Sequence, residues 1–179
     1  MTTVRVIGCG NPDAGDDAAG IVAIERAREA LGTIPGVEVL PLVSPLDVVH
    51  HLDGADAVVV VDAIRTPGGA RPPGTVIRAV AGPDGLQAEI GSSLSSHGFG
   101  VVEAFGLASA IGPLPEVVVV GVEAERTAPG RPMSRAVRAA LPHLTEAVVR
   151  EARSLAAQAE RTQTAGPSDP PRGGEPLAR

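Results

Sequence analysis

Short apolar runs alternate with amphipathic stretches along most of the chain. The apolar runs are rich in Val, Ile and Leu and predict strands over residues 4–8, 37–43, 57–62, 75–80 and 116–122. Apolar residues at helical spacing predict helices over residues 17–31, 45–52, 98–111 and from 133 to about 158. Because strands and helices alternate, we predict an α/β fold of three layers, a mostly parallel sheet with helices on both faces.

Two of the apolar runs predict the centre of that sheet. Residues 57–61 and 117–120 carry no polar side chain, as expected for strands that are covered on both faces. The chain has 179 residues, of which 44% are hydrophobic and 20% charged, a composition typical of one globular domain. Its last residues are rich in Pro, Gly and polar side chains. We therefore predict a single domain over residues 1–161 and a disordered C-terminal tail over residues 162–179.

The first predicted strand ends in a glycine turn that acidic residues follow. Gly8 and Gly10 lie in the turn, and the pair Asp16-Asp17 stands where the first helix begins. Such a turn forms a binding crevice at the carboxyl edge of a sheet, and here the crevice is acidic. The dinucleotide-binding fingerprint needs a third glycine where Asp13 stands, and the aspartates would repel a pyrophosphate. The turn therefore favours a metal ion or a cationic group.

Composition and charge exclude several classes of partner. The chain has 15 Lys and Arg against 21 Asp and Glu, a formal net charge of −6, which offers no attraction to nucleic acids or anionic membranes. It has no Trp or Tyr on which bases would stack. The single cysteine, Cys9, excludes an internal disulfide and is assigned to packing. The sequence shows no signal peptide and no membrane span, so we expect a cytoplasmic protein, and we expect a monomer.

Three polar residues stand where the predicted topology brings chain segments to one crevice. Asp17 follows the first strand, Asp62 ends the strand over 57–62, and His97 precedes the helix over 98–111. Two carboxylates and an imidazole suit a divalent ion such as nickel, zinc or manganese.

Each residue also has a simpler interpretation. Asp17 is explained as a helix cap, Asp62 as a cap of the next loop, and His97 as an ordinary residue at a helix start. Since crevice residues lie outside the core, we expect substitutions there to change stability by about 1 kcal/mol or less.

Several short motifs, in their order and spacing, resemble the hydrogenase maturation protease family. They are Gly8-Cys9-Gly10-Asn11-Pro12, Gly15-Asp16-Asp17, Gly20, Val60-Val61-Asp62-Ala63, Ser96-His97-Gly98 and Val120-Gly121-Val122-Glu123. The resemblance covers about residues 4–150. The chain departs from the family at Ala18-Ala19-Gly20, where Gly-x-Gly is common.

The resemblance implies an endopeptidase that removes the C-terminal extension from the large-subunit precursor of a nickel–iron hydrogenase. It implies that Asp17, Asp62 and His97 are the catalytic and metal-binding residues. The metal is then nickel that the precursor supplies, rather than nickel that the free enzyme holds tightly. The implied partner is the precursor, with no nucleic acid and no membrane.

Two alternatives stay open at this point. A non-cleaving nickel-binding scaffold for metallocentre assembly would use the same three ligands and leave its partner uncut. A peptidyl-tRNA hydrolase-like esterase also begins with a Gly-x-Gly-Asn-Pro turn, but that family places a His-Asn pair where this chain has Asp16-Asp17-Ala18-Ala19. An acidic chain with few aromatic residues is also a poor match to an RNA-binding enzyme.

Overall fold

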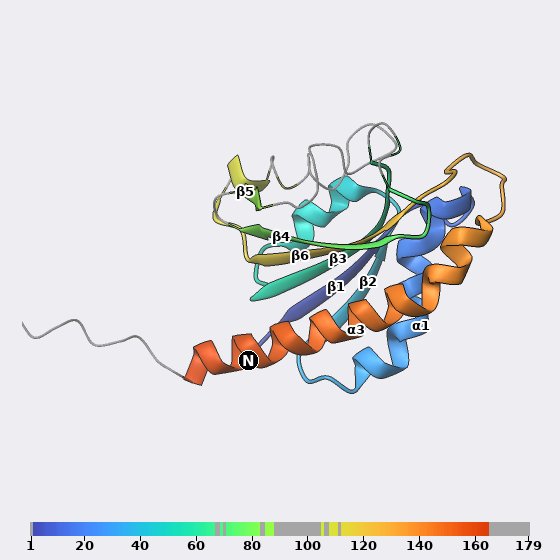
Figure 1. The fold of residues 1–179 in the computed structure, drawn as a ribbon. Coiled ribbons are helices and arrows are strands. Elements are labelled where there is room, and N and C mark those ends of the chain that lie inside the picture. The colour runs from blue at the N-terminus through green and yellow to red at the C-terminus, as the bar shows by residue number, and fades with distance from the viewer. Residues whose placement is uncertain are drawn as a thin grey trace, which may run out of the picture.

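The described part of the chain is built around one twisted sheet of six strands (Figure 1). The computed structural model describes residues 2–66, 69, 71–82, 85–87, 105, 108–110 and 112–164. Within these ranges the strands are β1 (Val4–Cys9), β2 (Val37–Leu42), β3 (Ala57–Ile64), β4 (Val76–Gly82), β5 (Gly85–Gln87) and β6 (Glu116–Glu123). Their order across the sheet is β2-β1-β3-β6-β4-β5.

The sheet is mostly parallel, as the sequence predicts. Strands β2, β1, β3 and β6 run parallel to one another. Strand β4 runs antiparallel to β6, and β5 runs antiparallel to β4, an orientation that the alternation of strands and helices does not predict. A parallel neighbour needs a long crossover, usually a helix, and residues 65–75 are too rich in Pro and Gly to supply one. Strand β4 therefore joins the sheet in the opposite direction.

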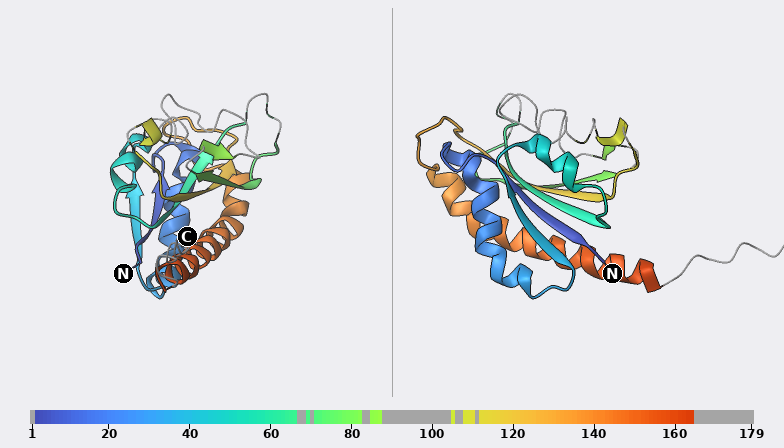
Figure 2. Two further views of the ribbon diagram at one scale, coloured as in Figure 1. Left: turned by 90° about the vertical axis from the view of Figure 1, so that its left-hand side faces the viewer. Right: turned by 180° about the vertical axis from the view of Figure 1, so that it is seen from behind.

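Helical elements cover both faces of the sheet, which confirms the three-layer prediction (Figure 2). On one face, α1 (Ala19–Gly32) and α3 (Arg135–Thr164) pack against each other and against the apolar side chains of the parallel strands. On the other face lies the short 3-10 helix η2 (Pro45–His51), together with Phe105 and Ala108. The helix predicted over 98–111 lies mainly outside the described residues, and its described residues, 105 and 108–110, are helical.

The centre of the sheet is where the apolar runs predict it. All eight residues of β3 are buried, and so are seven of the eight residues of β6. A continuous apolar run forms a strand rather than a helix here because Val dominates it and the strand is packed on both faces.

Helix α3 runs further than the sequence predicts. It passes without interruption through Pro142, which is exposed, and it ends at Thr164, three residues beyond the predicted domain boundary at residue 161. The Thr162 hydroxyl donates to the carbonyl oxygen of Gln158, and the Thr164 hydroxyl donates to those of Glu160 and Arg161. The Arg161 carbonyl lies in the last turn, where a helix leaves carbonyls without a backbone partner. The boundary at residue 161 and the disordered tail stay predictions, since residues 165–179 lie outside the described residues. None of the helices in the described ranges combines the length and apolar content of a membrane span.

Candidate active site at the carboxyl edge of the sheet

The glycine turn after β1 brings the first acidic residues against the end of that strand. Gly10 has a φ of +129°, and a Cβ built on it would lie 1.8 Å from the carbonyl oxygen of Asp17. A Cβ on Gly20 would lie 2.3 Å from the carbonyl oxygens of both Cys9 and Val61. Only glycine fits at these two positions. The short 3-10 helix η1 (Gly15–Ala18) and the start of α1 therefore pack directly on the ends of β1 and β3.

Asp17 lies in η1 and turns its carboxylate back toward the glycine turn. Its Oδ2 accepts a hydrogen bond of 2.8 Å from the backbone N–H of Asn11, and the side chain is half-buried. No side-chain hydrogen bond caps the start of η1 or of α1. The interpretation of Asp17 as a helix cap is therefore wrong, because its carboxylate closes the preceding turn instead.

Asp62 is a buried carboxyl group inside the central strand. It is 4% exposed, and its Oδ1 accepts a hydrogen bond of 2.8 Å from the N–H of Ala63. Alternation along β3 directs it to the face that carries η2. Burial raises the pKa of Asp62 to about 8, the negative charge of Asp17 adds to the rise, and the Ala63 hydrogen bond opposes it. Asp62 is therefore largely protonated at neutral pH, and it lies within electrostatic reach of Asp17.

Cys9 lies beside this pair and is a packing residue, as the sequence predicts. The pairing of Gly8 with Val61 places Cys9 and Asp62 at neighbouring positions on adjacent strands. Burial, followed by the charges of Asp62, Asp17 and Asp47, raises the pKa of the Cys9 thiol well above its usual value. Since the thiolate is the nucleophilic form, this thiol is unsuited to nucleophilic attack. The influence of Asp47 also shows that η2 approaches the same edge.

The structure thus brings Asp17 and Asp62 together at the carboxyl edge of the sheet. His97, the third predicted site residue, lies outside the described residues. In the described part of the chain, no three His, Cys, Asp or Glu side chains form a group that could hold a metal ion. Two carboxyl groups are present at this edge, and their role as metal ligands together with His97 stays a prediction.

Sequence reasoning missed two further buried carboxylates near this edge. Asp16, the neighbour of Asp17, is fully buried, and Glu123 at the end of β6 is 3% exposed. Both accept hydrogen bonds from neighbouring loops. The adjacent pair Asp16-Asp17 was one available signal, because a single cap explains only one of two aspartates.

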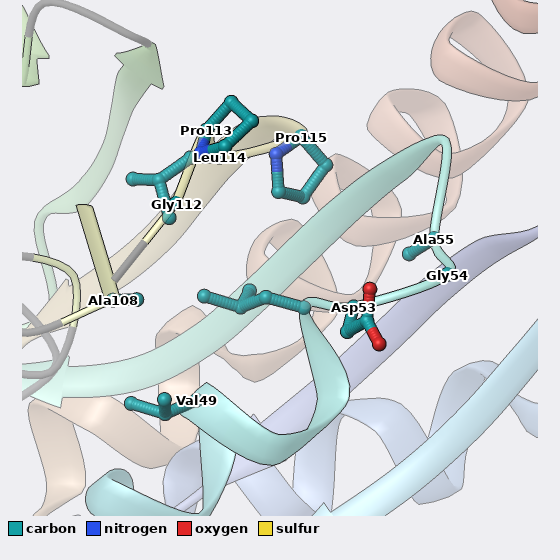
Figure 3. A pocket seen from close by; sticks show the side chains of 10 residues that line it. Val49, Asp53, Gly54, Ala55, Ala108, Gly112, Pro113, Leu114 and Pro115 are labelled. Atoms are coloured by element: carbon teal, nitrogen blue, oxygen red, sulfur yellow. The ribbon is translucent and has the colours of Figure 1, made fainter. Parts of the chain in front are cut away.

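A cavity lies away from this edge (Figure 3). It has a volume of about 600 Å³ and is lined by Val49, Leu52, Asp53, Gly54, Ala55, Ala108, Gly112, Pro113, Leu114 and Pro115. These residues precede β3 and β6, so the cavity lies at the amino edge of the sheet, opposite Asp62. Among the described residues that line it, Asp53 alone is titratable. These residues therefore do not supply the paired groups of a catalytic site.

Comparisons with known proteins agree on one family. The model of the hydrogenase maturation protease family (HycI) matches residues 43–151, more than half of the chain. The chain therefore belongs to the hydrogenase maturation proteases and is a peptidase. This membership decides against the peptidyl-tRNA hydrolase alternative. A search of curated protein sequences finds no match.

Several solved structures with the same fold are described as hydrogenase maturation proteases or as endopeptidases. A [NiFe] hydrogenase maturation protease, HycI, from Thermococcus kodakarensis is 26% identical, with a TM-score of 0.61 over 86% of this chain and 93% of that chain. The hydrogenase-maturating endopeptidase HybD from E. coli is 23% identical, with a TM-score of 0.65 over the same shares of the two chains, 86% and 93%. An endopeptidase from Escherichia coli, solved in solution, is 24% identical, with a TM-score of 0.65 over 84% and 93%. They support the α/β architecture described above.

Proposed function

We propose that this chain is the endopeptidase that removes the C-terminal extension of a nickel–iron hydrogenase large-subunit precursor once nickel has been inserted. The observation that carries the proposal is the pair Asp17 and Asp62 at the carboxyl edge of the sheet. The fold holds Asp62 buried and next to a second negative charge. Two carboxylates in such a place are electrostatically unfavourable for the free protein, and an arriving cation offsets their repulsion.

The cation in this proposal is nickel that belongs to the precursor. Asp17, Asp62 and His97 add two carboxylates and an imidazole to its coordination sphere, a donor set that suits nickel. A precursor without nickel gives these side chains nothing to bind, so the same contacts that recognise the substrate also test whether it is loaded. With so few ligands of its own, the free enzyme holds metal weakly, and nickel is therefore part of the substrate rather than a resident cofactor.

Once bound, the metal lies at the edge of the sheet where a peptide carbonyl or a water molecule has access to it. A divalent ion in that position polarises a carbonyl or activates a water. Asp17 and Asp62 orient the loaded centre in this scheme. The precursor is the partner, the working form is a monomer, and the reaction takes place in the cytoplasm.

Cleavage of the precursor separates this proposal from a scaffold that uses the same ligands. We expect the purified protein to convert a nickel-loaded precursor into two products, and mass spectrometry to detect the released C-terminal peptide. A scaffold would form a stable complex with the intact precursor and release no peptide, which would contradict the proposal.

A further inference from the structure

One segment bonds both to the loop that carries Asp17 and to the chain at the end of β3, the strand that carries Asp62. It runs from Glu123, at the end of β6, to Ser134, just before α3, and is called the clamp segment here. The first loop leads from β1 through the glycine turn to Asp17. The second begins after Ile64, the last residue of β3, two residues beyond Asp62. The clamp segment therefore links the regions of Asp17 and Asp62 through hydrogen bonds, although it is more than 50 residues away from each of them in sequence.

Asp16 makes the connection to the first loop. Its Oδ2 accepts hydrogen bonds from the N–H groups of Glu125 and Arg126 at 2.8 and 3.0 Å, and its Oδ1 accepts one from Ser134 N–H at 2.6 Å. The N–H of Asp16 in turn donates to the carbonyl oxygen of Arg126 at 2.9 Å. Asp16 is fully buried, so these four bonds fix the backbone directly next to Asp17.

The backbone around Asp16 strengthens this connection. Gly130 N–H donates to the carbonyl oxygen of Asp13 at 2.8 Å. Gly15 has a φ of +62°, and a Cβ on it would lie 2.8 Å from the carbonyl oxygen of Arg126. The loop before Asp17 and the clamp segment are therefore in close backbone contact at several points.

Glu123 makes the connection to the second loop. Its Oε1 accepts a hydrogen bond of 2.7 Å from Thr66 N–H, and its Oε2 accepts one of 2.6 Å from the Thr66 hydroxyl. Next to it, the N–H of Ala124 donates to the carbonyl oxygen of Ile64 at 2.7 Å. These bonds fix the chain two to four residues after Asp62.

Both oxygens of Asp16 and both oxygens of Glu123 accept hydrogen bonds from the protein. We propose that Asp16 and Glu123 are positioning residues, which hold the loop of Asp17 and the end of β3, where Asp62 lies, at the separation that a metal-loaded precursor requires. The inference rests on the proposed function, since it assigns the metal to Asp17 and Asp62. Charged acceptors on backbone donors are among the stronger hydrogen bonds, and they suit a site that must be rigid before its substrate arrives.

The test compares Asp16→Asn and Glu123→Gln with a variant that destabilises the fold at a distant place. Leu155→Ala serves as this control, because Leu155 is buried on α3 beside Asp56 and Glu116, at the amino edge of the sheet. Each full-length variant is titrated with Ni²⁺ alone, followed by NMR line broadening, and is assayed for precursor cleavage well below its melting temperature.

We expect Asp16→Asn and Glu123→Gln to weaken Ni²⁺ affinity and to lower kcat/KM by about ten- to a hundredfold, the range typical of residues that support metal ligands. Leu155→Ala should keep both quantities within about twofold, although its melting temperature falls. The proposal is wrong if the two positioning variants behave like Leu155→Ala, or if Leu155→Ala loses as much affinity as they do.

Two further variants keep the outcome interpretable. Thr66→Val deletes the hydroxyl hydrogen bond to Glu123 and keeps the side-chain volume. It therefore tests the role of the clamp segment if Asp16→Asn does not fold. If Thr66→Val and Glu123→Gln both fold and both keep the Ni²⁺ affinity of the parent, the inference is overturned. Asp17→Asn tests the proposed function itself. If Asp17→Asn keeps full affinity and cleavage, the proposed function fails, whereas if it loses both and the positioning variants lose neither, the clamp inference alone fails.

Discussion

Asp62→Asn is expected to make the protein more stable at pH 7 and to abolish precursor cleavage. Burial and the charge of Asp17 raise the pKa of Asp62 to about 8 in the folded protein, while an aspartate in an unfolded chain titrates near about 4. The fold therefore keeps a carboxyl group in an environment that opposes its ionised form. Asparagine is neutral and still offers an oxygen to Ala63 N–H, so it removes this penalty.

The pH dependence has a definite sign. Below about pH 4 the carboxyl group is protonated in both states and contributes nothing to the pH dependence. Between about pH 4 and pH 8 the folded state binds the proton that the unfolded state has lost, so stability falls as the pH rises, by at most about 1.4 kcal/mol per pH unit. Asp62→Asn lacks this loss, and its advantage should approach a few kcal/mol at pH 7.

Urea unfolding of the two proteins at pH 4.5 and pH 7.5 measures the effect. The difference in the free energy of unfolding should be small at the lower pH and large at the higher one. A difference that is independent of pH, or a variant that is less stable at pH 7.5, would show that Asp62 is ionised in the folded protein. This expectation replaces the sequence-based one of about 1 kcal/mol or less, which takes Asp62 for a crevice residue, whereas it is buried in β3.

Asp17→Asn should lower kcat/KM for precursor cleavage by more than about a hundredfold, beyond the range of residues that merely support a metal ligand. Stability should change by only about 1 kcal/mol or less, because Asp17 is half-buried and asparagine still accepts the hydrogen bond from Asn11 N–H. Single-turnover cleavage of the loaded precursor measures the loss.

Cys9→Ser is the matched control variant, because it replaces the thiol next to the two aspartates. The Cys9 thiol is buried and its pKa is raised, so serine should retain cleavage at a rate close to that of the parent. The opposite pair of results, normal cleavage by Asp17→Asn and none by Cys9→Ser, would instead assign the chemistry to a cysteine nucleophile in the glycine turn.

Local sequence patterns are enough to predict the central strand, the close-packed glycines and the position of Asp62 along the chain. The uninterrupted apolar residues at 57–61 indicate a strand buried on both faces, and β3 is one. The glycines around Asp17 indicate close backbone approach, and Gly10 and Gly20 leave no room for a Cβ. Asp62 at the end of that run indicates a group at the carboxyl edge of the sheet. These features follow from backbone sterics and from strand direction.

Long-range partners are what the sequence conceals. Asp16 receives its hydrogen bonds from residues 109 to 118 positions later in the chain, and no local pattern distinguishes it from Asp17. Glu123 similarly bonds to Thr66, 57 positions earlier. The depth of Asp62 is also hidden, because alternation along β3 says which face it lies on and not how closely other elements cover it. The direction of β4 depends on the Pro- and Gly-rich composition of the segment before it rather than on β4 itself.

The most direct test of the account is a comparison of two precursors that differ only in nickel. The purified protein is incubated with nickel-loaded and with nickel-free large-subunit precursor at equal concentration, and the released C-terminal peptide is quantified by mass spectrometry. The account predicts cleavage of the loaded precursor and no detectable cleavage of the nickel-free one. Equal rates for both precursors would contradict it, because the proposed recognition of nickel by Asp17, Asp62 and His97 requires the metal.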